Sequence, residues 1–212
     1  MAKQTLKQFA YTSIKEKILY CEYRPNTYLS EDFLCEELNI SRTPVRDALS
    51  RLEQEHLITI LPKKGILVTP VTSEVINMVF EGRLLLEPYI VENYCSDLPI
   101  EKIEYMKNIT TQYELAIKKG DESLYYELDN AFHTCIISQC TNHYLLQTYE
   151  VLQNQDQRLR ILTGTILKER LLVTIKEHND VLSHLESGDL KAASVLLKTH
   201  LTNSKISSFQ IL

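Results

Sequence analysis

The chain has 212 residues, of which 44% are hydrophobic and 24% are charged, with 23 Lys and Arg against 28 Asp and Glu. This composition indicates a globular protein with a real core, organised as one large domain or two small ones. No apolar run approaches the ~20 residues of a membrane-spanning helix, and the N-terminus lacks the apolar segment of a signal peptide, so we expect a soluble, cytoplasmic protein.

Charge is distributed unevenly along the chain. Residues 1–70 hold ten Lys and Arg against nine Asp and Glu, whereas residues 71–212 hold thirteen against nineteen. A net charge of −5 argues against a protein that coats nucleic acid with its whole surface, but the first part can still present a local basic face to phosphates. The five cysteines are odd in number and include no C-x-x-C pair, which is typical of reduced thiols.

The first part of the chain predicts three helices followed by a β-hairpin. Apolar residues recur at roughly helical spacing over 5–20, and Ser30 is a suitable N-cap for a short helix that ends at Leu38. Ser41 can cap the third helix. The segment ITILPKKGILVTP, residues 58–70, predicts two short strands around a turn. Three helices and a hairpin make a winged helix-turn-helix.

The third helix carries cations at its start. Its stripe of Val45, Leu49 and Leu52 packs inward, which leaves Arg42 and Arg46 on the open side. In helix-turn-helix proteins these N-terminal positions reach base edges, and arginine matches guanine O6 and N7. The alternative is a solvated helix start, but the helix dipole disfavours cations there.

These segments resemble the DNA-binding domain of GntR-type bacterial transcription regulators. The motifs that carry the resemblance are P-x-x-x-L-S-E-x-x-L, S-R-T-P-V-R-x-A-L-x-x-L and G-x-x-V, within residues 10–70. The resemblance implies operator contacts by four residues of the third helix: Ser41, Arg42, Thr43 and Arg46. It also implies that the wing tip at Gly65 enters the minor groove, and Lys63 and Lys64 beside it add charge for phosphates. Asp32 departs from the pattern, because relatives often have a DNA-contacting arginine there, and Asn26 replaces the usual glycine after Pro25.

The rest of the chain predicts an all-helical bundle. We place the domain boundary near Pro70–Thr72, which gives a DNA-binding domain at 1–70 and a helical domain at 73–212. Breaks in the helical pattern are expected at five places: 96–99, 120–121, 140–143, 164 and 187–189.

Metal-ligand residues lie on the inward stripes of three of these helices. Asp129 and His133 stand one turn apart within 121–139. His178 lies within 166–187 and His200 within 189–205, and the turn at 187–189 places the two at one level of an antiparallel pair. A single histidine on such a stripe is more often a hydrogen-bonded core residue, but three with a carboxylate favour a divalent ion such as zinc, nickel or manganese.

This part resembles the FCD effector domain of the FadR subgroup of GntR regulators, over about 73–205. The matching motifs are R-x-x-L-E from Arg83, D-x-x-x-H followed by N-x-x-L from Asn142, E-H at 177–178, G-D at 188–189, and His200. The resemblance implies that the metal ligands are Asp129, His133, His178 and His200. It makes Arg83 the main candidate to bind an effector carboxylate, with Asn142 a weaker one. The alternative for Arg83 is a buried ion pair with Glu87.

Together these features predict a transcription regulator and not an enzyme. It would bind pseudo-palindromic operator DNA as a homodimer and respond to a small organic acid held in the metal-containing domain. Two alternatives stay open. The first is a metal-dependent hydrolytic enzyme, since such a centre could activate water. The second is a metal that only stabilises the bundle.

Overall fold

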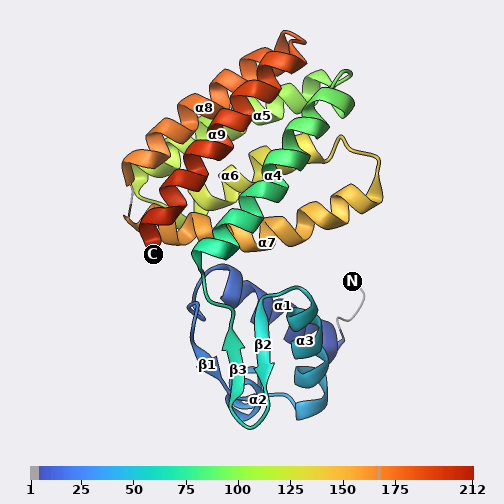
Figure 1. Cartoon of the computed structure of the whole chain (residues 1–212), viewed down its shortest axis with the longest axis vertical. Helices are drawn as coiled ribbons and strands as arrows, with labels where there is room; N and C mark the ends of the chain where they lie inside the picture. Colours follow the sequence, from blue (N-terminus) through green and yellow to red (C-terminus); the bar gives the residue numbers. More distant parts are fainter. Residues whose placement is uncertain (1–4, 167) are drawn as a thin grey trace. The chain divides into compact units, whose positions relative to one another are not determined.

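The structure, a computed structural model, describes residues 5–166 and 168–212 and divides into two compact units, Met1–Thr72 and Ser73–Leu212 (Figure 1). Residues 1–4 of the expected first domain and Leu167 of the expected 166–187 helix lie outside the described residues. Within the described part, no helix combines the length and apolar character that a membrane crossing requires.

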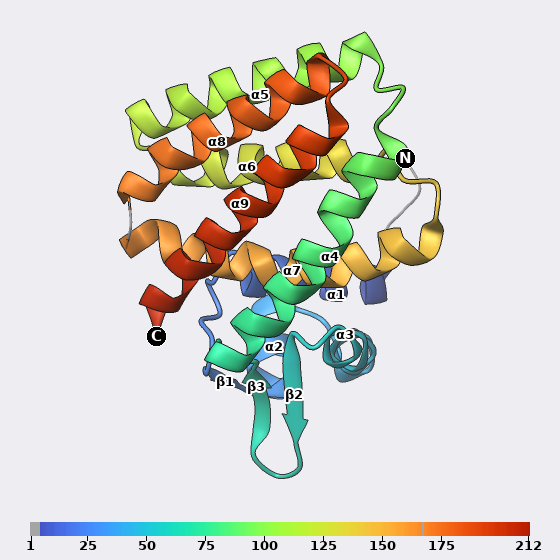
Figure 2. The same cartoon turned by 45° about the horizontal axis from the view of Figure 1, so that its top comes forward.

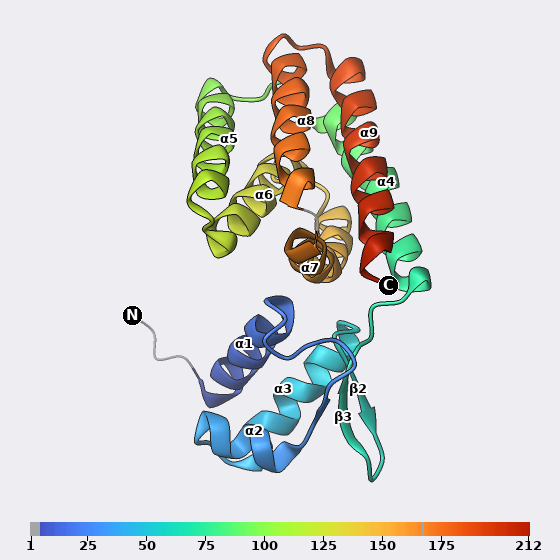
Figure 3. The ribbon, with the colours of Figure 1, turned by 90° about the vertical axis from the view of Figure 1, so that its left-hand side faces the viewer.

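The first unit is the predicted winged helix-turn-helix (Figure 3). Its elements are α1 (Leu6–Leu19), β1 (Tyr28–Leu29), α2 (Glu31–Leu38), α3 (Arg42–Gln54), β2 (Ile58–Leu61) and β3 (Gly65–Val68). The strands form an antiparallel sheet in the order β1-β3-β2, so β1 joins the predicted hairpin at the edge of β3. β1 was not predicted, because two residues are too few to show a strand periodicity.

Local capping explains where the helices of this unit begin and end. Ser30 caps α2, since its hydroxyl accepts from the Phe33 N–H at 3.1 Å, and Asn39 ends α2 in a left-handed conformation, φ 52°. Asn26 likewise has φ 67°, which asparagine tolerates. Ser41 stands at the N-cap position of α3, but the expected side-chain cap is wrong: its hydroxyl makes no cap hydrogen bond. The start of α3 therefore keeps an exposed hydroxyl and N–H groups without a side-chain cap.

The second unit is the predicted helical bundle. Its elements are α4 (Ser73–Tyr94), α5 (Ile100–Lys119), α6 (Glu122–Ile137), α7 (His143–Ile166), α8 (Lys168–Glu186), α9 (Leu190–Ser208) and the short η1 (Phe209–Ile211). Figure 2 shows α8 and α9 side by side as an antiparallel pair, with α5 along α8 and α4 along α9. Buried residues such as Phe132, Leu182 and Leu197 form a core between these helices.

The break expected at Gly164 is wrong, because α7 continues to Ile166. Glycine is tolerated inside a helix, and here close packing accounts for it. A Cβ at Gly164 would collide with the side chain of Tyr126, whose hydroxyl donates to the Ile161 carbonyl at 3.1 Å. The glycine thus marks a close approach between α6 and α7.

Gly65 has both a left-handed φ of 101° and a close neighbour, since a Cβ there would lie 2.6 Å from the Leu29 carbonyl oxygen. We expect Gly65→Ala to destabilise the wing by about 2 kcal/mol or more, because backbone must shift. Hydrogen exchange of the β1 and β3 amides measures this. The control is Gly120→Ala, which has a similar φ of 71° but open space around it. If Gly65→Ala lost no more stability than Gly120→Ala, the close contact with the Leu29 carbonyl would not be the cause of the loss.

Candidate metal centre and DNA interface

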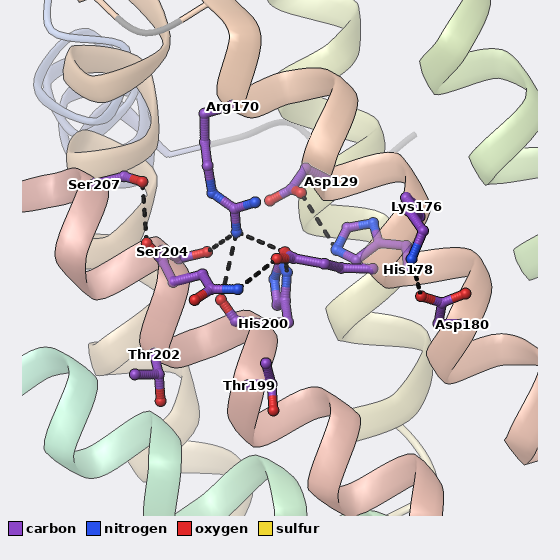
Figure 4. Close-up of polar contacts among 12 residues, drawn as sticks. Asp129, Arg170, Lys176, His178, Asp180, Thr199, His200, Thr202, Ser204 and Ser207 are labelled. Atoms are coloured by element: carbon purple, nitrogen blue, oxygen red, sulfur yellow. Dashed lines mark hydrogen bonds and ion pairs between the residues drawn. The ribbon is translucent and has the colours of Figure 1, made fainter.

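Four buried residues predicted as metal ligands come from three helices of the second unit. α6 supplies Asp129 and His133, α8 supplies His178, and α9 supplies His200. Each lies on the apolar, inward face of its helix. One ligand nitrogen from each histidine lies within 4.8 Å of those of the other two. The structure therefore brings the three histidines together at one point of the bundle, and Figure 4 shows His178 and His200 there beside Asp129.

Carboxylates hold two of these imidazoles from behind. His133 Nδ1 lies 2.7 Å from Glu87 Oε2, and His200 Nδ1 lies 2.7 Å from Glu177 Oε2. An ionised carboxylate only accepts, so each histidine donates from Nδ1, and the neutral form of each imidazole carries its lone pair on Nε2. The two Nε2 atoms face each other at 3.2 Å. Two lone pairs at that distance repel unless a proton or a cation lies between them.

The third histidine has an unsatisfied ligand atom. His178 Nε2 is buried and makes no hydrogen bond; it lies 3.6 Å from Asp129 Oδ1. Burial lowers the pKa of both His133 and His178 well below the usual histidine value, with neighbouring positive charges adding to the effect. Neutral imidazoles with free Nε2 lone pairs are the donors that a divalent metal needs, so these residues fit such an ion.

Asp129 stands slightly apart from this cluster. Its Oδ2 lies 2.9 Å from Arg160 Nη1, while its Oδ1 faces His178. Burial alone would raise its pKa, but the charge of Arg160, with that of the histidines, outweighs burial and holds the pKa below the usual value. Asp129 is therefore ionised and shared between the arginine and the histidine cluster.

Arg83 and Arg160 form ion pairs with the buried carboxylates around the histidine cluster. Arg83 pairs with Glu87 at 2.5 Å and with Asp156 at 2.5 Å. Arg160 Nε pairs with the second oxygen of Asp156 at 2.6 Å. From the sequence, the partner of Arg83 could be either Glu87 or an effector. In the structure its guanidinium pairs with Glu87 and Asp156.

Arg170 contacts the far side of the histidine cluster. Its Nη2 donates to Glu177 at 2.6 Å and to the Ser204 hydroxyl at 3.0 Å (Figure 4). Hydrogen bonds from His200, Arg170 and Asn203 to Glu177 outweigh its burial and lower its pKa to about 2. Arg160, Arg170 and Asp156 were not predicted as site residues, because none of them lies on an apolar stripe or in a motif that marks a site in the sequence.

A cavity of about 60 Å³ adjoins the histidines. Its walls include Arg83, Asp129, His133, Asp156, Arg160, Thr163, Arg170 and His200. Several buried donors in these walls have no hydrogen-bond partner: Arg160 Nη2, Arg170 Nε and Nη1, and Thr163 Oγ1. Buried polar groups are nearly always satisfied, so these atoms call for a ligand or water that accepts hydrogen bonds.

The structure does not bring Asn142 to this cavity. Asn142 is exposed, and its Oδ1 accepts from the Tyr144 N–H at 3.0 Å at the start of α7. Its side chain is thus used in capping this helix, a role that the N-x-x-L motif does not distinguish from ligand contact.

The predicted DNA-contacting residues lie together on the exposed start of α3 and on the wing. Ser41, Arg42, Thr43 and Arg46 are all exposed. Arg42 donates from Nε and Nη2 to Asp32 Oδ1, at 3.2 and 2.7 Å, and Arg46 Nε lies 3.0 and 2.9 Å from the Glu31 oxygens. Lys63 and Lys64 are exposed in the turn before Gly65.

Each of the two units matches a known protein family. Residues 6–68 match the bacterial regulatory proteins of the gntR family, and residues 78–203 match the FCD domain. The HTH-type transcriptional repressor RspR of Escherichia coli K12 is 24% identical, over 98% of this chain and 91% of its own. The repressor GlaR of the same organism is 28% identical, over 90% of each. The solved structure of E. coli McbR/YncC shares the fold, with a TM-score of 0.80 at 20% identity over 97% of this chain and 98% of that one.

The chain therefore belongs to the GntR family of bacterial regulatory proteins that carry an FCD domain. It is a transcription regulator with a DNA-binding helix-turn-helix domain. The alternative of an enzyme is excluded because its domains and relatives are those of transcription regulators. FCD domains are often associated with a metal, and the three histidines are a possible site for one.

We expect Arg83→Ala to destabilise the second unit by about 3–5 kcal/mol, because two buried carboxylates, Glu87 and Asp156, lose their partner. Urea unfolding measures the loss. The control is Lys107→Ala, which breaks exposed pairs with Glu104 and Glu186 in the same unit and should cost about 1 kcal/mol or less. Equal stability of the two variants would show that the buried pairing does not hold the bundle.

Proposed function

We propose that this regulator binds operator DNA as a homodimer and that its FCD domain senses a small carboxylate held beside a divalent metal. The observation that carries the proposal is the cavity next to the three histidines, with unpaired guanidinium and hydroxyl donors in its walls. A metal that only stabilised the bundle would need no such space. The cavity and its donors therefore favour sensing over a purely structural ion.

His133, His178 and His200 would hold the metal, with Asp129 as a fourth ligand. Imidazole nitrogen with one carboxylate and no thiolate suits zinc, nickel or manganese. Such an ion would act as a Lewis acid toward an oxygen of the effector. Glu87 and Glu177 keep two of the imidazoles in the tautomer that ligation requires.

The charges around the cavity bear on the kind of effector. Three guanidinium groups face four carboxylates: Arg83, Arg160 and Arg170 against Glu87, Asp129, Asp156 and Glu177. With neutral imidazoles this group of residues is negative by one charge, and a divalent cation makes it positive by one. Because an uncompensated buried charge is costly, a ligand with a single negative charge completes the balance. A monocarboxylate fits better than a dicarboxylate.

The free donors suggest how such an acid would be held. A carboxylate accepts two parallel hydrogen bonds from a guanidinium, and Arg160 and Arg170 both line the cavity. Thr163 Oγ1 offers a third, uncharged contact to a hydroxyl or carbonyl oxygen. About 60 Å³ is room for a few water molecules or a small acid, but not for a fatty acyl chain. Arg83 would act indirectly, through Glu87 and Asp156, and Asn142 would not contact the effector.

The exposed start of α3 is the part of the first unit that would contact operator DNA. Its arginines would read base edges, while Ser41, Thr43 and the wing residues Lys63, Lys64 and Gly65 would contact the backbone and the minor groove. A dimer doubles these few contacts on a pseudo-palindromic operator. Met78, Leu85 and Tyr89 are 54%, 71% and 48% exposed on one face of α4, an apolar surface that supports pairing with a second copy.

We expect His178→Ala to lower metal content strongly, because one of three clustered ligands is lost. Elemental analysis of the purified protein measures it. The matched control is His184→Ala on the same helix, since His184 is 41% exposed and lies outside the cluster. If His178→Ala kept the full metal content of the wild type, the assigned centre would be wrong.

Thr163→Val should weaken binding of the effector by about 1 kcal/mol, roughly fivefold in affinity. The substitution removes one unpaired hydroxyl and keeps the shape and charge of the side chain. Thermal-shift screening of small carboxylic acids identifies the ligand, and its titration against the operator complex measures the loss. Thr110→Val is the control: Thr110 is equally buried, but its hydroxyl donates to the Lys107 carbonyl at 3.0 Å, away from the cavity. An unchanged Thr163→Val response would remove Thr163 from the effector site.

A further inference from the structure

We infer that Asp32 is a specificity-determining residue that positions Arg42 for base recognition; this rests on the proposed role of Arg42 in operator binding. Asp32 stands in the first turn of α2 and Arg42 in the first turn of α3. The resemblance to GntR regulators leads one to expect an arginine at position 32. In this chain position 32 carries a negative charge instead of a positive one.

The geometry of the pair leaves the reading edge of the arginine open. Asp32 Oδ1 accepts from Nε and Nη2 of Arg42, at 3.2 and 2.7 Å, which is the side of the guanidinium nearest its own chain. Among the described residues, no hydrogen bond engages Nη1 of Arg42. The outer Nη1–Nη2 edge can still present two N–H groups to guanine O6 and N7. The carboxylate thus holds the side chain without blocking its end.

The neighbouring pair repeats this arrangement. Both Glu31 oxygens lie close to Nε of Arg46, at 3.0 and 2.9 Å, and no hydrogen bond to another described residue engages either Nη group of Arg46. Glu31 and Asp32 are adjacent in a helix whose start is fixed by the Ser30 cap. Two successive acidic residues therefore hold two arginines one turn apart on α3, each by its inner edge.

Holding Arg42 has two consequences for DNA binding. First, an arginine loses much side-chain freedom when it contacts a base, and a side chain already oriented loses less, so correct contacts are favoured. Second, the negative charge of Asp32 near the DNA weakens the attraction between the protein and the phosphates. That attraction is the same for every DNA sequence. Both effects raise the ratio of operator affinity to affinity for unrelated DNA. The pair itself adds little stability, since Arg42 and Asp32 are 62% and 67% exposed.

A blocking pair is the opposite possibility and predicts a different result. If Asp32 only competed with DNA for Arg42, its removal would tighten operator binding and leave the preference between bases intact. A positioning residue instead loses preference at the base pair that Arg42 reads. The two cases are separated by measuring discrimination as well as affinity.

The experiment uses the full chain and an operator duplex that the wild-type protein selects from random-sequence DNA. Affinities are measured for this duplex, for versions changed at single guanine–cytosine pairs, and for unrelated DNA. The variants are Asp32→Ala, Asp32→Asn, Arg42→Ala and the double variant Asp32→Ala/Arg42→Ala. Glu36→Ala is the control, because it removes the same charge from exposed α2 surface without an ion pair among the described residues.

We expect Asp32→Ala to lower discrimination at one base pair per half-site by about three- to tenfold and to raise affinity for unrelated DNA. Asp32→Asn keeps an acceptor but no charge, so it should retain discrimination while unrelated DNA binds more tightly. In the Arg42→Ala background, Asp32→Ala should change discrimination no further. Glu36→Ala should leave discrimination at wild-type level.

Three outcomes would overturn the inference. Wild-type discrimination in Asp32→Ala, with discrimination lost in Arg42→Ala, would leave Arg42 as a reader and remove the positioning role. Tighter operator binding with intact discrimination would identify Asp32 as a blocking residue. Wild-type discrimination in Arg42→Ala would remove both the inference and the proposed reading role of Arg42.

Discussion

Buried charges in the second unit must neutralise one another, and this requirement governs how its helices meet. Four helices around the histidine cluster contribute ion-pair partners to this network: α4 through Arg83 and Glu87, α6 through Asp129, α7 through Asp156 and Arg160, and α8 through Arg170 and Glu177. A buried ion left without a partner costs several kcal/mol. A helix that slipped by one turn would strand such an ion, so the network selects one register where apolar packing alone would tolerate several.

The same carboxylates that balance charge also orient the histidines, so the proposed metal and effector sites share atoms with the packing of the bundle. Glu87 contacts both Arg83 and His133, and it lies on α4, the helix that directly follows the DNA-binding unit in the chain. An effector that changes the position of Arg160 changes its partner Asp156, and through Arg83 reaches α4. The proposed ligand would thus have a continuous set of ion pairs through which to act on α4, the helix joined to the first unit.

The sequence predicted those features that depend on local signals. Caps and apolar spacing indicate the winged helix, and the turn at 187–189 places His178 and His200 at one level. The charged site residues of α7, Asp156 and Arg160, could not be predicted, because residues 153–158 read QNQDQR and leave no apolar stripe to tell inward from outward faces. Asn142 lies away from the cavity for another reason: a motif fixes residue types but not whether a side chain caps its own helix.

Carboxylates stand behind the candidate functional side chains in both units, but burial decides what these carboxylates do there. Behind the histidines Glu87 is buried and Glu177 is largely covered by protein, so these carboxylates affect both the tautomer and the stability of the bundle. Behind Arg42 the carboxylate is exposed to water, where an ion pair contributes about 0–1 kcal/mol at most. Its influence is then on orientation and local charge. Those two quantities distinguish one DNA sequence from another, whereas unfolding measurements would hardly detect them.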